Sequence, residues 1–125
     1  MEENDLSGNV IGAAIEVHRL LGPGLLESAY ELALARELVL RGHRVTRQTP
    51  ISLEYKGVAL VDAFRIDLIV DESLLLEIKA VEVLLPIHER QLLTYLQLTG
   101  KRFGLVINFN EELLKKGVRR VINGY

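Results

Sequence analysis

The stretch that decides the fold is Leu74-Leu75-Leu76-Glu77-Ile78-Lys79-Ala80-Val81, in which only Glu77 and Lys79 are charged. A run that is apolar at nearly every position is typical of a strand buried on both faces of a sheet. Glu77 and Lys79 are two residues apart, so both side chains point to the same face of that strand. Because burying charges is costly unless they are paired or bind a metal ion, this face is the first candidate for a functional site.

The segment Phe64-Arg65-Ile66-Asp67-Leu68-Ile69-Val70 also places an acid, Asp67, inside an apolar run. If residues 71–73 form a three-residue loop, antiparallel pairing places Asp67 directly opposite Glu77, on the same face. The Cβ atoms would then lie roughly 4.5–5.5 Å apart. Two carboxylates at that separation repel each other unless a cation lies between them. A two-residue loop would move Asp67 to the other face, whereas a five-residue loop would keep the pairing.

An ion pair without any ligand is the alternative interpretation of these charges. Glu77 would pair with Lys79, or Arg65 with Asp67, inside the sheet. Either pair considered alone favours this structural interpretation, because ion-pair networks also bury charges. The occurrence of both on adjacent strands favours a metal-binding site.

The rest of the chain predicts helices around this sheet. Asp5 or Ser7 is suited to cap the first helix, Gly42 to end the second, and Pro50 indicates an edge strand or a bulge. The helix after the Glu77 strand returns the chain to a parallel strand, which gives a mixed sheet. We therefore expect an α/β fold, an α+β mixed sheet flanked by helices, in a single domain of residues 1–125. In chain order, the expected elements are a helix to about Leu21, a helix over Leu25–Leu40, strands over Val45–Tyr55, Val58–Val70 and Leu74–Val81, a helix over Pro86–Thr99, a strand over Phe103–Phe109, a helical turn over Glu111–Lys116 and a strand over Val118–Ile122.

Composition narrows the classes of function. The 125 residues are 49% hydrophobic, so disorder is not expected. The absence of cysteine excludes disulfides, thiolate zinc sites and cysteine nucleophiles. The chain has no signal-peptide pattern and no apolar run of roughly 18 residues, so we expect a cytoplasmic protein without a membrane partner.

Charge is close to balanced, at −2, which counts against nonspecific coating of nucleic acid but allows a small local contact surface. Basic residues gather in three clusters, and each cluster alone is interpreted as solvated surface charge. The clusters are Arg41, Arg44 and Arg47; Lys101 and Arg102; and Lys115, Lys116, Arg119 and Arg120.

The order of motifs resembles a known group of proteins. Asp67, nine intervening residues and then Glu77-Ile78-Lys79 is similar to the signature of the PD-(D/E)XK nuclease superfamily. Within it, the chain resembles the GxxExxY protein family, whose motif stands here as Gly24-Leu25-Leu26-Glu27-Ser28-Ala29-Tyr30. The similarity runs from about Val10 to Val121. Further similar segments are Ile66–Val70, Gln91–Leu96 and Gly104–Phe109, although Ile66 stands where the superfamily often has proline.

This resemblance implies a restriction-endonuclease-like core and a metal-dependent phosphodiesterase acting on nucleic acid, DNA rather than RNA. Asp67, Glu77 and Glu27 would hold Mg²⁺ or Mn²⁺ through carboxylate oxygens, with the carbonyl of Ile78 as an extra ligand. Lys79 would orient or help deprotonate a water molecule and stabilise the transition-state charge. Glu27 has a structural alternative, since a glutamate in the first turn of a helix is favoured by the helix dipole.

Four further residues are candidates for positioning the substrate. Gln91 and Tyr95 are four residues apart on one helix and share a face, which His88 extends. An ordinary amphipathic helix explains this pattern equally well. Tyr30 is interpreted either as core packing or as an orienting hydroxyl. Of the other histidines, His18 is expected in the core and His43 at the surface.

Two rival functions stay open at this point. The first is a non-catalytic nucleic-acid or nucleotide binding module on a nuclease fold, and the second is a self-associating structural protein with a buried charge network. A homodimer is compatible with each, because small sheets with open edges often self-associate.

Overall fold

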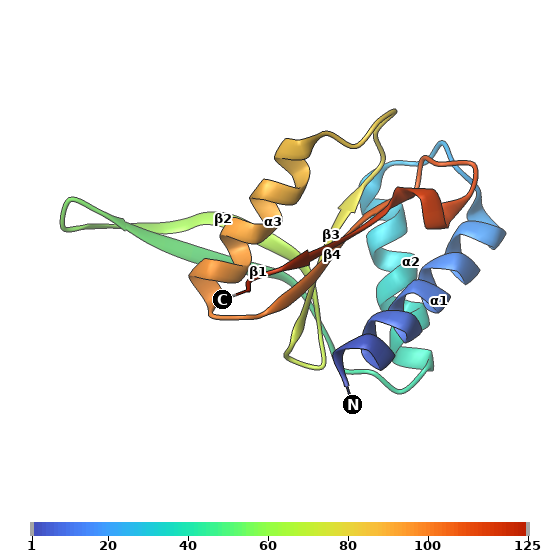
Figure 1. The fold of residues 1–125 in the computed structure, drawn as a ribbon, viewed down its shortest axis with the longest axis horizontal. Coiled ribbons are helices and arrows are strands. Elements are labelled where there is room, and N and C mark those ends of the chain that lie inside the picture. The colour runs from blue at the N-terminus through green and yellow to red at the C-terminus, as the bar shows by residue number, and fades with distance from the viewer. Residues whose placement is uncertain (1, 125) are drawn as a thin grey trace.

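One mixed sheet organises the protein. In residues 2–124, which the computed structural model describes, five strands lie in the order β1-β2-β3-β4-β5 (Figure 1). Neighbouring strands are antiparallel except β3 and β4, which are parallel, as the crossover through α3 predicts. The elements are α1 (Glu3–Leu21), α2 (Glu27–Leu40), β1 (Val45–Tyr55), β2 (Val58–Val70), β3 (Leu74–Lys79), α3 (Pro86–Thr99), β4 (Phe103–Asn108), the 3₁₀ helix η1 (Leu114–Gly117) and β5 (Val118–Ile122).

Helices cover both faces of the sheet. α1 and α2 pack on one face, over a core that includes Leu76 and Ile78 of β3. α3 packs on the other face, where Leu75 of β3 meets Leu92 and Leu96 of the helix. Figure 1 shows β3 and β4 running between these two layers. Burial on both faces explains the almost continuous apolar run of β3.

The predicted register of β2 and β3 is confirmed. Val70 pairs with Leu74 across the turn of residues 71–73, and the ladder continues to the pair Leu68–Leu76. Asp71 and Glu72 supply the left-handed backbone of this turn, with φ of 50° and 60°. Continued by one residue, this register sets Asp67 opposite Glu77.

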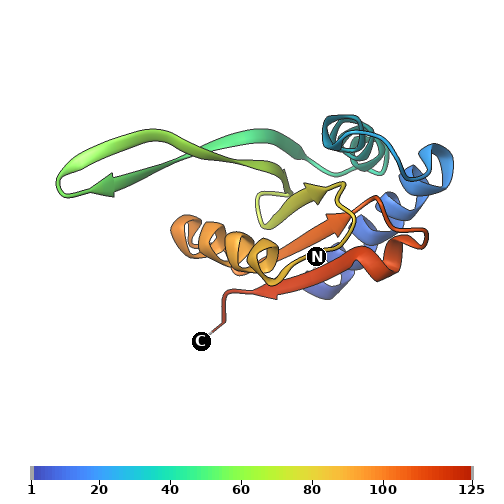
Figure 2. The same ribbon diagram turned by 90° about the horizontal axis from the view of Figure 1, so that it is seen from above.

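Beyond this ladder β1 and β2 form a long two-stranded arm that extends away from the helices (Figure 2). At its base Phe64 stacks on Tyr95 of α3, with ring centroids 4.5 Å apart. β1 is an edge strand, and the register of the arm shifts between Ile51 and Leu53. Both features are consistent with Pro50, which cannot donate to a ladder and is tolerated at edges and near bulges.

Several expected boundaries and environments are wrong. α1 begins at Glu3, so Asp5 and Ser7 lie inside the helix; Ser7 is buried and donates to the carbonyl of Asn4. α2 begins at Glu27 rather than Leu25. His43 is buried rather than exposed, and its Nδ1 lies 2.8 Å from the Asp71 carboxylate, which compensates for the burial of the ring nitrogen.

β3 ends at Lys79 and β4 ends at Asn108, slightly before the ends expected from the sequence. The helical turn expected over Glu111–Lys116 is the 3₁₀ helix η1. No helix within residues 2–124 is long and apolar enough to cross a membrane.

Candidate functional site

The two central acids lie where the β2–β3 ladder opens. Its last pair is Leu68–Leu76, and at the next position side chains replace the backbone bonds. The N–H of Ile78 donates to Asp67 Oδ2 at 2.8 Å, and the N–H of Asp67 donates to Glu77 Oε1 at 3.4 Å. Each carboxylate therefore accepts a hydrogen bond from the opposite strand, which holds the two acids next to each other.

An unusual backbone conformation in β1 accompanies this opening. The pairs Arg47–Leu68 and Thr49–Ile66 place Gln48 level with Asp67, and Gln48 has a φ of 51°. A residue other than glycine in this region is strained, and such strain is frequent at functional sites. Ile66 belongs to the core beneath α3, whereas Leu68 belongs to the core beneath α1 and α2. In a regular strand these two side chains would share a face, so β2 turns over at Asp67.

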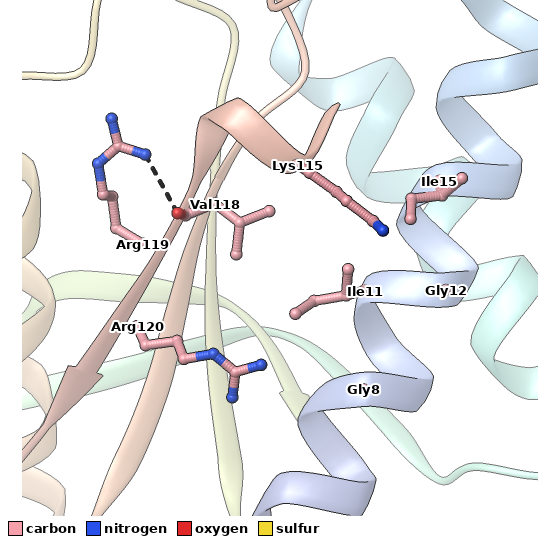
Figure 3. A pocket seen from close by; sticks show the side chains of 8 residues that line it. All are labelled: Gly8, Ile11, Gly12, Ile15, Lys115, Val118, Arg119 and Arg120. Atoms are coloured by element: carbon pink, nitrogen blue, oxygen red, sulfur yellow. Dashed lines mark hydrogen bonds between the residues drawn. The ribbon is translucent and has the colours of Figure 1, made fainter. Parts of the chain in front are cut away.

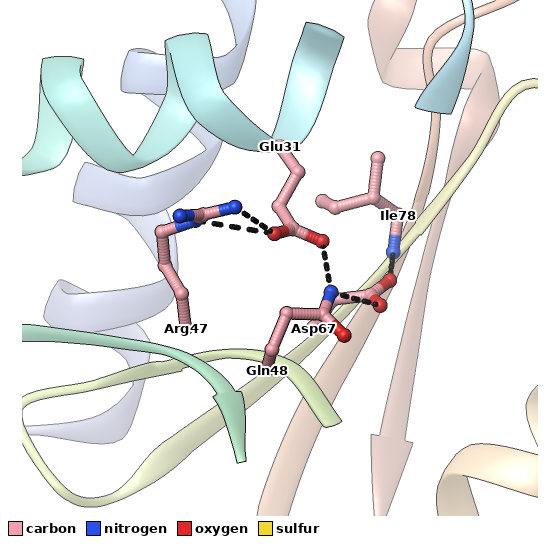
Figure 4. A network of polar contacts seen from close by, with 5 residues as sticks. All are labelled: Glu31, Arg47, Gln48, Asp67 and Ile78. Carbon is pink, nitrogen blue, oxygen red and sulfur yellow. Dashed lines mark hydrogen bonds and ion pairs between the residues drawn. The ribbon is translucent and has the colours of Figure 1, made fainter. Parts of the chain in front are cut away.

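Gln48 also connects Asp67 to a third acid, Glu31 of α2 (Figure 4). Its Nε2 donates to Glu31 Oε1 at 2.6 Å and to Asp67 Oδ1 at 3.4 Å. Arg47 pairs with the other oxygen of Glu31 at 2.9 Å. Glu31 is only 6% exposed, so these donors compensate for the burial of its charge.

Sequence reasoning missed Glu31 and Gln48 as neighbours of the site. A signal for Glu31 was present, because it follows Glu27 by four residues and therefore lies on the same side of α2. Gln48 carried no signal, since only the left-handed backbone at that position aims its amide between Glu31 and Asp67.

Electrostatics sets the central pair apart from ordinary surface acids. Burial, reinforced by the nearby Asp67 carboxylate, raises the pKa of Glu77 to about 8. Burial also raises the pKa of Asp67, although the hydrogen bond from Ile78 opposes this shift. The ammonium of Lys79 acts to lower both pKa values, so it lies close enough to the acids to influence them. Crowded acids with raised pKa values are the condition that a bound cation relieves.

Lys79 ends β3 and is half-buried beside Asn108 of β4, its partner in the parallel ladder. In the part of the chain that the structure describes, Lys79 forms no ion pair within 4.0 Å. Asn108 is buried, and its amide exchanges two hydrogen bonds with the backbone of Val81 at 3.0 and 2.9 Å. Asn108, which the sequence did not single out, thus fixes the chain directly after Lys79.

Glu27 approaches the site from the N-terminus of α2. Its side chain is exposed, and Oε1 accepts the N–H of Ala80 at 3.4 Å. Its negative charge acts to raise the pKa values of Asp67 and Glu77. The structure therefore brings the helical acid of the Gly24–Tyr30 motif to the end of β3.

Tyr30 packs in the core, which is one of the two interpretations that its sequence context left open. It is fully buried and stacks on Phe109 with ring centroids 4.6 Å apart. Its hydroxyl donates to the carbonyl of Gly22 at 2.6 Å and accepts the N–H of Leu25 at 3.0 Å. Tyr30 therefore fixes the loop that precedes Glu27.

On α3, the three expected substrate-positioning residues have different surroundings. Tyr95 is half-buried, and burial together with the charges of Glu77 and Asp67 raises its pKa, so its hydroxyl lies near the acids. Gln91 is exposed one turn earlier. His88 Nδ1 accepts the N–H of Leu85 at 3.0 Å and so caps the start of α3, and a contact of His88 with substrate stays a prediction.

The donors present suit a hard cation that keeps part of its water shell. Within residues 2–124 no group of three or more histidine, aspartate or glutamate side chains is positioned as a complete metal cage. Asp67 and Glu77 supply two adjacent carboxylates, and Mg²⁺ sites in enzymes that act on phosphates commonly use one or two carboxylates plus water and substrate oxygens. The residues therefore fit such an ion.

A mixed sheet between helices, with two acids at an opened pair of strands and a lysine two residues on, defines a nuclease-like core. A family model described as the PD-(D/E)XK nuclease superfamily matches residues 4–121, and the chain belongs to this superfamily. Comparisons with curated proteins and with solved structures gave no match.

Proposed function

We propose that this member of a nuclease superfamily is a Mg²⁺- or Mn²⁺-dependent phosphodiesterase that cuts nucleic acid, with DNA as the preferred substrate. We also assign it to the GxxExxY family within the superfamily, on the Gly24–Tyr30 motif. One observation carries the proposal: Asp67 and Glu77 are in hydrogen-bond contact across two strands, with Lys79 on the same strand as Glu77. A purely structural ion-pair network would be expected to neutralise Lys79 with a carboxylate at short range.

The carboxylates of Asp67 and Glu77, with the carbonyl of Ile78, would hold the ion, and Glu27 is proposed to join them by turning its exposed side chain towards it. When bound, it supplies a lowered pKa for a coordinated water molecule and neutralises charge on the phosphate. The chain's own contribution is to hold Asp67 and Glu77 in alignment, while the ion would favour their ionised form. Their hydrogen bonds from Ile78 and Asp67 backbone N–H groups maintain that alignment.

Lys79 is the residue proposed to act on the attacking water and on the phosphate. A cation two residues from Glu77 on the same face orients the water and stabilises negative charge that develops on the phosphoryl oxygens. The attacking water gives a proton to solvent and the leaving 3′- or 5′-oxygen takes one from solvent, so that water and the phosphodiester become a phosphate monoester and an alcohol. Tyr95 and Gln91 are proposed to contact the substrate from α3; the exposure of Gln91 and the nearness of Tyr95 to the acids support that role.

The test is cleavage of labelled single- and double-stranded DNA and RNA by the purified protein with Mg²⁺ or Mn²⁺. Glu77→Ala and Lys79→Ala are expected to abolish cleavage, whereas Glu54→Ala, an exposed acid on the arm, is the matched control. Cleavage that persists unchanged in both site variants would defeat the assignment. Binding without turnover in the wild type would support the non-catalytic binding module instead. The expected homodimer stays a prediction, for which sedimentation velocity is the measurement.

A further inference from the structure

A cavity of about 710 Å³ lies between α1 and the segment formed by η1 and β5, and we call it the β5 groove. Ile11, Ile15 and Val118 give it an aliphatic lining. Figure 3 shows Lys115 and Arg120 extending from one wall towards α1, where Gly8 and Gly12 present no side chain. The groove is therefore open, apolar at its base and crossed by two cationic side chains.

The groove is positively charged in a chain whose net charge is −2. Lys115, Arg119 and Arg120 line it, and no acid is among its lining residues within the described part of the chain. The Arg120 guanidinium is held in place by donating to the buried hydroxyl of Ser7 at 2.7 Å. Arg119 has an acid nearby, Glu89 at 3.7 Å, but both side chains are about half exposed and the pair is weak. The positive charge of the groove therefore favours an anionic ligand.

Two basic clusters that are distant in sequence meet along this edge of the sheet. β5 is the edge strand, and just beyond its end Asn123 donates its backbone N–H to the carbonyl of Arg102 at 2.7 Å and its side-chain amide to the carbonyl of Lys101 at 3.1 Å. The cations thus follow β5 from one end to the other, with Arg120 on the α1 side and Arg119 on the α3 side, where it meets Glu89. We call this set the basic edge, formed by Lys101, Arg102, Lys115, Lys116, Arg119 and Arg120. Glu3 offsets part of its charge through an exposed ion pair with Arg102 at 3.5 Å.

The basic edge begins near the candidate site. Val118 pairs with Ile107 of β4, and the next residue of β4, Asn108, pairs with Lys79 of β3. Neighbouring strands are about 4.8 Å apart, so the β5 edge lies roughly 10 Å from Lys79. The groove lies on the α1 side of the sheet, whereas Glu77 and Lys79 share the α3 side with Leu75. A polymer that follows this edge would therefore have to pass around the end of the sheet to reach the acids.

We infer that the basic edge binds single-stranded nucleic acid next to the phosphodiester that is cut; the inference rests on the proposed function for the identity of the anion. A row of cations along an edge matches regularly spaced phosphates. A single strand exposes bases and sugars that can cover the aliphatic base of the groove, while its phosphates meet Lys115 and Arg120. A duplex stacks its bases inside and presents mainly charged backbone, so it would leave Ile11 and Ile15 uncovered.

The test measures binding without cleavage. Fluorescence anisotropy of a labelled oligothymidylate is followed in EDTA as KCl is raised, with the wild type and with Lys115→Gln/Arg120→Gln. Loss of two phosphate contacts is expected to weaken binding roughly tenfold at low salt. It is also expected to reduce the slope of log K against log salt by about 1.4, since each contact to a single strand contributes about 0.7.

Because Arg120 contacts Ser7, Lys115→Gln/Lys116→Gln is a second variant that leaves this hydrogen bond in place and is expected to act in the same direction. Arg36→Gln/Lys56→Gln removes the same charge from exposed positions on α2 and on the arm, and is expected to bind like the wild type. A labelled duplex and a polyglutamate competitor identify the class of ligand. Tighter binding of the duplex, or displacement by polyglutamate as effective as by unlabelled oligothymidylate, would overturn the inference.

This experiment separates the inference from the proposed function. A wild type that cuts nucleic acid while the basic-edge variants bind normally disproves the inference alone. A wild type that cuts nothing, yet binds single strands through the basic edge, disproves the proposed function alone. A wild type that binds no oligonucleotide at low salt in EDTA also overturns the inference.

Discussion

β3 pairs with its two neighbours in different ways. Against β4 it is regular over all six residues, from Leu74–Phe103 to Lys79–Asn108. Against β2 the ladder stops after three pairs and the carboxylates of Asp67 and Glu77 accept the backbone N–H groups beyond it. The regular side supplies rigidity, and the interrupted side brings ionisable groups into the sheet. The candidate site thus forms where backbone pairing between β2 and β3 stops, on a strand that is otherwise regularly paired.

The largest expected effect comes from removing charge on the interrupted side while keeping its shape. Asp67→Asn retains an oxygen that can accept the Ile78 N–H, so the fold is expected to persist. Loss of one of two adjacent ligands is expected to reduce cleavage by roughly a hundredfold or more. Steady-state cleavage assays with circular dichroism as a folding control measure this. An activity equal to that of the wild type would show that the opened ladder is structural only.

A second prediction uses the raised pKa of Glu77, about 8 against an ordinary value of 4.5. The folded protein binds this proton more tightly than the unfolded chain, so metal-free stability is highest below the unfolded pKa and falls as the pH rises through 8. Every tenfold gain in proton affinity corresponds to about 1.4 kcal/mol, so the total effect is on the order of a few kcal/mol. Urea denaturation in EDTA between these pH limits is the measurement. Glu77→Gln is expected to flatten the profile, and a wild type that gains stability as the pH rises from 4.5 to 8 would contradict the prediction.

Adding Mn²⁺ at pH 7 gives a second test of the raised pKa of Glu77. Because the ion needs ionised carboxylates, its binding is expected to release protons and to stabilise the wild type. Glu77→Gln should show neither effect. Proton release is measured by calorimetry in buffers of different ionisation enthalpy.

A third prediction concerns the strained residue on the interrupted side. Gln48→Ala keeps a side chain at a φ of 51° but removes the amide between Glu31 and Asp67. Leaving buried Glu31 with fewer donors is expected to cost about 1–3 kcal/mol of stability. If the amide aligns Asp67, kcat should fall roughly tenfold with little change in KM.

Gln48→Asn is the conservative partner, since asparagine tolerates the left-handed region and keeps an amide on a shorter stem. It is expected to recover part of the stability and part of kcat. Equal kcat values for the wild type and Gln48→Ala would assign Gln48 a structural role only.

The sequence predicts some features of the candidate site, whereas others depend on contacts that form only in the folded protein. The β2–β3 register could be predicted, because loop length and two-residue alternation fix which side chains face each other. The local structural roles of Tyr30 and His88 could not be predicted, because their polar atoms bond to nearby backbone groups and composition does not reveal those partners. The role of Gln48 depends on a backbone conformation that propensities disfavour. The merging of the basic clusters depends on tertiary pairing of β4 with β5.

The smallest effect on activity is expected from the regular side, at Gly104 of β4. A Cβ there would meet Leu92 of α3 at 2.9 Å and the carbonyl oxygen of Leu75 at 3.1 Å. Gly104→Ala therefore forces α3 outward or strains the parallel ladder, at an expected cost of about 1–3 kcal/mol. Because the acids lie across β3 from this contact, cleavage per folded molecule should stay within about twofold of the wild type. Urea denaturation and active-site-normalised rates measure the two quantities. A large loss of activity per folded molecule would mean that the position of α3, through Tyr95, is part of the chemistry, and the contrast between a rigid side and a reactive side of β3 would fail.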